Sequence, residues 1–404
     1  MARVPSPPDP APATTAGPAA AAPATVGLVL PGGGARAAYQ VGVLKAVAEL
    51  VPRDSPLPFR VISGTSAGAI ISAILASHAS QFRLGVSSLE RFWRNFRVDQ
   101  VFHADTGSML RSGLHWLLAL VSGGFLVPPP RSLFDNQPLR ELLERHVNFA
   151  RIRQHLEHGA LDALAVNASA YRTAASVAFY ECARETAPWL HSWRLGEPAD
   201  LGLDHLMASA AVPFLFPAVY MDGEYYGDGA MRQLAPLSPA ISLGAERLLV
   251  IGVRPPPALT GIAAPEVIPS PHSGPGRAPT FGQIFGFILD TLFMDGVQSD
   301  IERLQRDNLL ITAAGGAAAG LKRIEVVSIA PRIDFGPIAQ RHQEDIPRAL
   351  RILLQTMGAA NPGGRTLLSY LLFQGSYTRE LIALGYEDGL ARKDEIQALL
   401  RSEP

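Results

Sequence analysis

The sequence has little cysteine, little lysine and no long uninterrupted apolar run. Cys182 is the only cysteine, so no intrachain disulfide can form, which fits a reducing compartment. No stretch of about 18 or more apolar residues occurs, so a membrane-spanning helix is not predicted. The formal net charge is -1, and this near-neutral balance gives no electrostatic reason to expect nucleic acid as a partner.

Arginine supplies nearly all of the basic charge, since lysine occurs only at Lys45, Lys322 and Lys393. The simplest explanation is a GC-rich bacterial genome. The first residues are rich in proline and alanine and lack the basic start and leucine-rich centre of a signal peptide. We therefore expect residues 1–24 to form a disordered tail.

The next part of the chain predicts alternating strands and helices. Residues 26–30 and 59–62 are short apolar runs typical of buried strands, and 37–50 and 67–76 are typical of helices. This order favours a parallel sheet with helices on its faces. Further helices are expected at 88–97, 133–147, 203–211, 281–310, 349–357 and 367–384, a hairpin at 218–230, and strands at 161–168, 174–180, 248–253 and 324–329.

Ser66 stands between the second strand and its helix, flanked by Gly64 and Gly68. A strand that reverses sharply into a helix needs small neighbours around its central residue, and it exposes that side chain beside the helix N-terminus. The positive end of the helix dipole there favours a developing anion. The pattern predicts a nucleophilic serine. The alternative is a Gly/Ser turn that only caps an ordinary helix.

A glycine loop precedes the first helix. Gly32, Gly33 and Gly34 allow backbone N–H groups to approach a ligand closely, and Arg36 adds a positive charge. The loop can therefore supply the donors that a serine nucleophile needs for its oxyanion. A nucleotide-binding loop is the alternative, but the acidic residue at suitable spacing, Asp54, lies before the second strand instead of at its end.

The general base is the deciding question, because no histidine stands in a sequence context typical of catalysis. His272 lies in a loop rich in proline, glycine and serine, and His342 lies near the C-terminal helices. Asp228, between Gly227 and Gly229 at the end of a strand, is better placed to take the serine proton. An ordinary β-turn aspartate is the alternative.

Three motifs in this order resemble those of the patatin-like phospholipases, and the C-terminal helices resemble those of bacterial members. The motifs are the loop 32–36, the elbow 64–68 and Asp228 with Gly229 and Ala230. The resemblance implies a three-layer α/β fold with a mainly parallel central sheet, helices on both faces and a helical C-terminal extension. It implies a catalytic domain over 25–255, a loop at 256–280 and a mainly helical region at 281–404 packed on that domain.

The resemblance further implies a Ser66–Asp228 dyad that cleaves ester bonds of lipids through an acyl-enzyme. The oxyanion would be held by the loop 32–34, and no metal or cofactor would be needed. Three positions depart from the family pattern. Ala37 and Ala230 replace glycines, and Leu234 stands where an asparagine is expected, which removes a hydrogen bond near Asp228.

Three other functions stay open. An acyltransferase of related fold would use the same acyl-enzyme on Ser66. An α/β-hydrolase with a full triad would need a histidine, and its elbow normally follows more strands than precede this one. A non-catalytic lipid-binding protein would not need Ser66 and Asp228. The sequence does not indicate the head group, the acyl chain length or the oligomeric state.

We expect phospholipid or another acyl lipid as the substrate. We also expect a cytoplasmic protein, with the inner membrane face as an alternative place of action. Two segments could meet a lipid surface. Residues 114–127 are apolar and nearly uncharged. Apolar residues also recur at helical spacing at Phe281, Ile284, Phe285, Ile288, Leu289 and Leu292. Since the acidic Asp290 and Asp295 follow on the same helix, we expect this second stripe to pack in the core.

Overall fold

The computed structural model describes residues 24–103, 131–255, 278–313, 322–359 and 364–401, together with residues 107, 114, 115, 118, 121, 122 and 125. The predicted tail and most of the predicted loop at 256–280 lie outside this set. Within it, no helix combines the length and the hydropathy that crossing a membrane would require.

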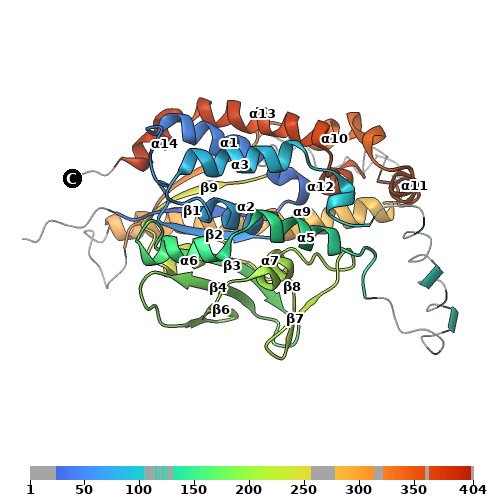
Figure 1. The fold of residues 1–404 in the computed structure, drawn as a ribbon, viewed down its shortest axis with the longest axis horizontal. Coiled ribbons are helices and arrows are strands. Elements are labelled where there is room, and N and C mark those ends of the chain that lie inside the picture. The colour runs from blue at the N-terminus through green and yellow to red at the C-terminus, as the bar shows by residue number, and fades with distance from the viewer. Residues whose placement is uncertain are drawn as a thin grey trace, which may run out of the picture.

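Helices and strands follow one another along the chain in the order shown in Figure 1. The strands are β1 Val26–Leu30, β2 Val61–Thr65, β3 Ala163–Ala170, β4 Ser176–Cys182, β5 Trp189–His191, β6 Arg194–Pro198, β7 Val219–Met221, β8 Glu224–Asp228, β9 Arg247–Ile251 and β10 Glu325–Ile329. The α-helices are α1 Ala38–Leu50, α2 Ala67–Ala76, α3 Phe82–Arg94, α5 Gln137–His146, α6 Phe149–Glu157, α7 Leu203–Ser209, α8 Ser238–Ser242, α9 Phe281–Ala313, α10 Gly336–Arg341, α11 Arg348–Thr356, α12 Arg365–Leu371, α13 Gly375–Ala391 and α14 Lys393–Leu400.

A single sheet runs through the molecule in the strand order β10-β9-β1-β2-β3-β4-β6-β5. The neighbours from β10 to β3 pair in parallel, whereas β4 pairs with β3 in the antiparallel sense. The hairpin of β7 and β8 joins this sheet through β3 as well. Parallel strands need helical crossovers, which explains why helices cover the parallel part of the sheet.

Alternation along β1 separates two buried layers. Leu28 and Leu30 pack into the larger core with α1, α2, α3 and α13, whereas Val29 packs into a second cluster with α8 and the later turns of α9. Successive side chains of a strand point to opposite faces, so the sheet is the middle layer of three. Figure 1 shows α13, α1 and α3 stacked above the sheet, with α9 running along it.

The C-terminal helices are closely joined to the rest of the fold. Gly42 of α1 faces α13 so closely that a Cβ there would lie 2.1 Å from the carbonyl oxygen of Ile382. The strand β10, which follows α9 in the chain, extends the sheet by pairing with β9. The two sides of the predicted loop at 256–280 therefore share one sheet and one core.

The expected three-layer α/β fold is confirmed, but several element limits were wrong. The strand predicted to end at 62 continues to Thr65, and the helix predicted at 88–97 is α3 at 82–94. Residues 367–384 do not form one helix, because the chain leaves the helical path at 372–374. The α5 helix begins at Gln137, where Pro138 occupies its first turn. The elements α6, α8, α10, α14, β5 and β6 were not predicted.

Candidate active site

Ser66 occupies a strained turn between β2 and α2. Its backbone has φ 55° and ψ -127°, a region that favours glycine, and its residue surface is 3% exposed. A Cβ on Gly68 would lie 2.1 Å from the carbonyl oxygen of Leu30, and one on Gly64 would lie 2.4 Å from Ser72 Oγ. The two flanking glycines are therefore required by space, which is the geometry of a nucleophile elbow.

Strand register brings Asp228 to the same place. Thr65, the last residue of β2, lies opposite Asn167 of β3, and Asp228, the last residue of β8, lies opposite Ala168. Since β4 occupies the other edge of β3, β2 and β8 share one edge and end facing each other. The residue after β2 is Ser66, so the two predicted catalytic side chains meet although 162 positions separate them.

The Asp228 carboxylate is buried, with 1% of the residue exposed. Its Oδ1 accepts the N–H of Ala230 at 2.9 Å, while its Oδ2 has no hydrogen-bond partner among the described residues. Burial raises the pKa of Asp228 to about 7, against the lowering effects of the neighbouring Ser66 hydroxyl and the Ala230 N–H. A carboxylate with this pKa can exchange a proton near neutral pH.

Gly229 and Ala230, the other two residues of the aspartate motif, hold this carboxylate in place. A Cβ on Gly229 would lie 2.2 Å from the carbonyl oxygen of Asn167, so only glycine lets the chain pass so close to β3. The Ala230 amide is the donor to Asp228. Replacing the commoner glycine by Ala230 leaves this backbone hydrogen bond intact.

A buried serine that the sequence analysis missed forms a hydrogen bond with the backbone of Ser66. Ser209, at the end of α7, accepts the backbone N–H of Ser66 at 2.8 Å and donates to the carbonyl oxygen of Asn167 at 2.6 Å. Asn167 in turn donates through Nδ2 to the carbonyl oxygen of Gly64 at 2.9 Å. These contacts tie the strained turn to β3. The predicted small-residue helix ending near Pro213 was the only signal in the sequence.

The departure at Leu234 has a structural explanation. Leu234 is 80% exposed, whereas the preceding Gln233 is 9% exposed and its Oε1 accepts the Thr65 hydroxyl at 2.5 Å. Thr65 Oγ1 also accepts from Asn167 Nδ2 at 3.2 Å. Gln233, one position earlier, therefore supplies a buried polar contact to the end of β2.

The glycine loop lies against the nucleophile and against the C-terminal helices. A Cβ on Gly32 would lie 3.0 Å from Ser66 Cβ and 2.5 Å from the ring of Phe293. Gly34 has φ 52°, and a Cβ there would meet the carbonyl oxygen of Tyr370 at 2.5 Å. Across the part of the chain that is described, the amides of Gly32, Gly33 and Gly34 donate no backbone hydrogen bond. They are therefore free to donate to a ligand.

Arg36 lies elsewhere than predicted. Its guanidinium is 2% exposed, donates to Ser369 Oγ at 2.7 Å and pairs with Asp290 at 3.1 Å. The guanidinium carbon, Cζ, also lies 4.0 Å from the centre of the Tyr370 ring. Since these partners come from α9 and α12, and Arg36 is not among the residues that line the pocket at Ser66, it fastens the glycine loop to the C-terminal helices.

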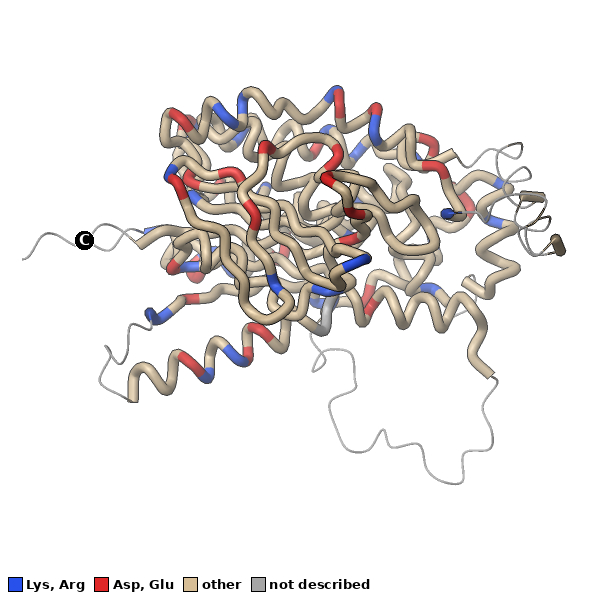
Figure 2. Tube along the Cα trace, turned by 90° about the horizontal axis from the view of Figure 1, so that it is seen from below, with Lys and Arg blue, Asp and Glu red and all other residues tan. Residues whose placement is uncertain are grey.

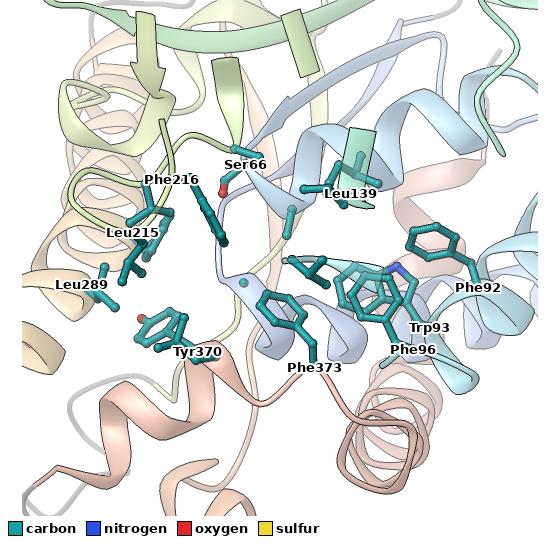
Figure 3. Close-up of a pocket in the computed structure, with 18 residues that line it drawn as sticks. Ser66, Phe92, Trp93, Phe96, Leu139, Leu215, Phe216, Leu289, Tyr370 and Phe373 are labelled. Carbon is teal, nitrogen blue, oxygen red and sulfur yellow. The ribbon is translucent and has the colours of Figure 1, made fainter. Parts of the chain in front are cut away.

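An apolar pocket opens at the Ser66 hydroxyl (Figure 3). Its walls come from α2, α3, α5, the segment after α7, α9 and the junction of α12 and α13, and the side chains are almost all aliphatic or aromatic. The volume that the centre of a water molecule can occupy is about 50 Å³, so the pocket is small. Leu289, Phe293, Tyr370, Leu371 and Phe373 form the wall contributed by the C-terminal region. A slender hydrocarbon chain suits such a space.

The family model of the patatin-like phospholipases matches residues 28–241, more than half of the chain. The chain belongs to the patatin-like phospholipase family. This membership is the basis for the activity proposed below. Whether the source is bacterial, as the resemblance suggested, stays a prediction.

Two individual proteins are similar to this member of the family. A lysophospholipase, NTE1 of the fungus Chaetomium globosum, is 46% identical over 55 residues, which are 14% of this chain and 3% of the fungal protein. Among solved structures, the crystal structure of VipD from Legionella pneumophila is similar over 93% of this chain and 67% of that one. Its TM-score is 0.39 and its sequence identity 12%.

The described histidines of this patatin-like protein lie away from Ser66. None of them lines the pocket. His205 accepts the Gly202 N–H at 3.1 Å and packs edge-on against Phe179. His272 lies outside the described residues. No group of three or more His, Cys, Asp or Glu side chains that could hold a metal ion occurs within the described ranges.

Proposed function

We propose that this chain is a serine lipid acyl hydrolase of the phospholipase A, lysophospholipase or esterase type. The observation that carries the proposal is the meeting of β2 and β8 at one edge of β3, which brings strained Ser66 to buried Asp228 at the mouth of an apolar pocket. In this proposal Ser66 is the nucleophile, Asp228 is the base, and the amides of Gly32, Gly33 and Gly34 stabilise the oxyanion.

The reaction begins with proton transfer from Ser66 Oγ to the Asp228 carboxylate as Oγ attacks the ester carbonyl carbon. The oxygen of the tetrahedral intermediate points to the glycine loop and to the N-terminus of α2, whose dipole stabilises negative charge. When the intermediate collapses, Asp228 returns its proton to the departing alcohol. Water then attacks the acyl-enzyme by the same route, and Asp228 takes and returns that proton.

The raised pKa of Asp228 suits both steps. With a pKa of about 7, a substantial share of the carboxylate is ionised at neutral pH and can accept a proton, and its conjugate acid gives that proton back readily. The free Oδ2 is the oxygen available for the exchange, since Oδ1 is held by Ala230.

The apolar pocket is proposed to hold the acyl chain. Because the fungal relative is named a lysophospholipase, single-chain lysophospholipids are the first substrates to assay, beside diacyl phospholipids and soluble p-nitrophenyl esters. Release of free fatty acid supports the proposal. Transfer of a labelled acyl group to another acceptor without release of fatty acid would identify an acyltransferase, and lipid binding without turnover would identify a binding protein.

We also propose a cytoplasmic place of action with peripheral contact to the inner membrane face, in a bacterial cell. The single cysteine and the arginine-rich composition support this proposal. Cell fractionation followed by immunoblotting tests it. Recovery of the protein outside the cytoplasm and the inner membrane would refute it.

A further inference from the structure

The first turns of α9 expose an unusual amount of apolar surface. Phe281, Ile284, Phe287 and Ile288 are 61%, 47%, 71% and 42% exposed, and we call these four residues the α9 apolar face. Their spacing places them on one side of the helix. The expectation that the stripe through this segment packs in the core is therefore wrong for Phe281, Ile284 and Ile288, although it holds for Phe285 and Leu289, which are buried.

The opposite side of these turns is fixed in place by close backbone packing. The N–H of Gly282 donates to the carbonyl oxygen of Met357 at the end of α11, at 2.6 Å. A Cβ on Gly286 would lie 3.0 Å from the backbone nitrogen of Leu367 in α12. Asp290, one turn further, is held by Arg36 and by the Tyr370 hydroxyl. The helix cannot turn its apolar face inward without breaking these contacts.

The α9 apolar face and part of the pocket wall belong to the same helix. Leu289 and Phe293 of the same helix line the pocket at Ser66, and Phe285 is buried between them and the first turn. The pocket and the α9 apolar face therefore lie on opposite sides of one helix, within about two helical turns of each other along its axis.

Charge distinguishes this face from the rest of α9. Residues 278–289 contain no charged side chain, whereas the later turns of α9 carry both acidic and basic residues, as Figure 2 shows. The helix that contacts the start of α9, α11, carries Arg348 and Arg351 and no acidic residue, and its Ile352 is 62% exposed. An apolar face with basic residues near it is the pattern of a helix that lies in a bilayer interface.

We propose that the α9 apolar face docks on the surface of a phospholipid bilayer and delivers lipid to the pocket at Ser66. The proposal rests on the proposed function for the source of the acyl chain, but the docking itself needs no turnover. The face would enter the boundary between head groups and acyl chains, with α11 and its arginines at the head-group level.

Vesicle sedimentation of Ser66→Ala protein tests the docking without catalysis. The test variant adds Ile284→Asp and Phe287→Asp, and the matched control adds Leu309→Asp and Leu310→Asp at the other end of the same helix. Leu309 and Leu310 are 71% and 63% exposed, so both pairs change exposed apolar residues to aspartate. With phosphatidylcholine vesicles containing phosphatidylglycerol, we expect at least about tenfold weaker binding for the test variant and unchanged binding for the control.

The same two pairs in the Ser66 protein separate docking from chemistry. Both should keep the melting temperature and the hydrolysis of p-nitrophenyl butyrate, while the Ile284/Phe287 pair loses activity on vesicle lipid. Equal vesicle binding by both pairs would overturn the proposal. So would a wild-type dimer that the Ile284/Phe287 pair converts to a monomer with vesicle binding intact, because the face would then bind a second copy. Absence of ester hydrolysis by wild type, with docking as expected, would refute only the proposed function.

Discussion

The two parts of this molecule that meet at Ser66 contribute different things. The region matched by the family, 28–241, carries every group assigned to the chemistry, and within it buried hydrogen bonds hold Ser66 and Asp228. The region from 281 to 401 contributes a wall of apolar side chains and the α9 apolar face, but no reacting group. Mutations of Ser66 and Asp228 should therefore be separable in effect from mutations of the C-terminal wall, whereas the glycine loop contacts both parts.

The largest effect is expected from Ser66→Ala. Turnover of a soluble p-nitrophenyl ester should fall by at least about 10³-fold, because the nucleophile is lost. The backbone strain at φ 55° is unchanged by alanine, so the fold should persist. Ser66→Gly should be equally inactive but more stable by about 1 kcal/mol in urea unfolding, since glycine accepts this backbone region. Substantial turnover by the folded Ser66→Ala protein would end the assignment.

Asp228→Asn should lower turnover by about 10²- to 10⁴-fold, because no histidine or other carboxylate is among the described residues that line the pocket at Ser66. In wild type, kcat/KM should rise with pH through about 7, as Asp228 loses its proton. His205→Ala is the control, since that ring lies outside the pocket. A loss in a folded histidine variant as large as that of Ser66→Ala would favour a triad.

Asp228 also makes a prediction about stability. Its folded pKa of about 7 exceeds the ordinary value of 3.8, so the folded state holds a proton that the unfolded state releases between these pH values. Wild-type stability from this residue is fully present below pH 3.8 and is lost as pH rises through about 7. At pH 8 the free energy of unfolding of Asp228→Asn, measured with urea, should therefore exceed that of wild type by at most about 4 kcal/mol. This difference should shrink toward pH 4. Equal differences at both pH values would show that Asp228 is ionised throughout.

Ser209→Ala should produce an intermediate effect, because it removes the acceptor for the Ser66 N–H. We expect kcat to fall about tenfold with little change in KM, because the Ser66 hydroxyl is no longer held in its reactive position while the pocket stays intact. Ser77→Ala is the matched control. Ser77 is also a buried serine that donates to a carbonyl oxygen, at 2.9 Å, but it lies at the far end of α2. Equal loss of kcat in both variants would assign Ser209 a purely structural role.

The smallest effect is expected in the C-terminal wall. Phe373→Ala enlarges the pocket beside Phe96, whose ring centre lies 5.5 Å away. The ratio of kcat/KM for p-nitrophenyl dodecanoate over butyrate should rise about tenfold, while turnover of butyrate stays near wild type. Phe335→Ala removes a similarly buried ring that lies outside the pocket and should leave the ratio unchanged. A parallel shift in both variants would mean that the wall acts through stability alone.

The glycine loop shows why the structure changes the choice of mutations. From the sequence alone, Gly34→Val is a reasonable test of oxyanion stabilisation by the glycine loop. In the structure, however, the valine side chain would meet Tyr370, and valine would have to adopt φ 52°. Gly32→Ala is no simpler, because its Cβ would meet Phe293. Loss of activity at either position therefore combines chemistry with displacement of the C-terminal wall.

Local sequence determined much of this protein. The spacing Gly64, Ser66, Gly68 between an apolar run and a helix was enough to predict the elbow, because tight turns depend on near neighbours. The turn at Asp222 and Gly223, both with positive φ, likewise followed from their residue types. The βαβα order predicted the parallel sheet for the same reason.

Tertiary structure alone decided how these pieces meet. The pairing of β8 with the end of β3 brings Asp228 to Ser66, and Ser209 and Gln233 join them only because α7 and the chain after β8 fold onto the same edge. Arg36 pairs with Asp290 because α9 supplies a partly buried carboxylate that no spacing in the sequence could reveal. Periodicity likewise marks α9 as apolar along a stripe, but only the position of its glycines against α11 and α12 determines which of its faces reaches water.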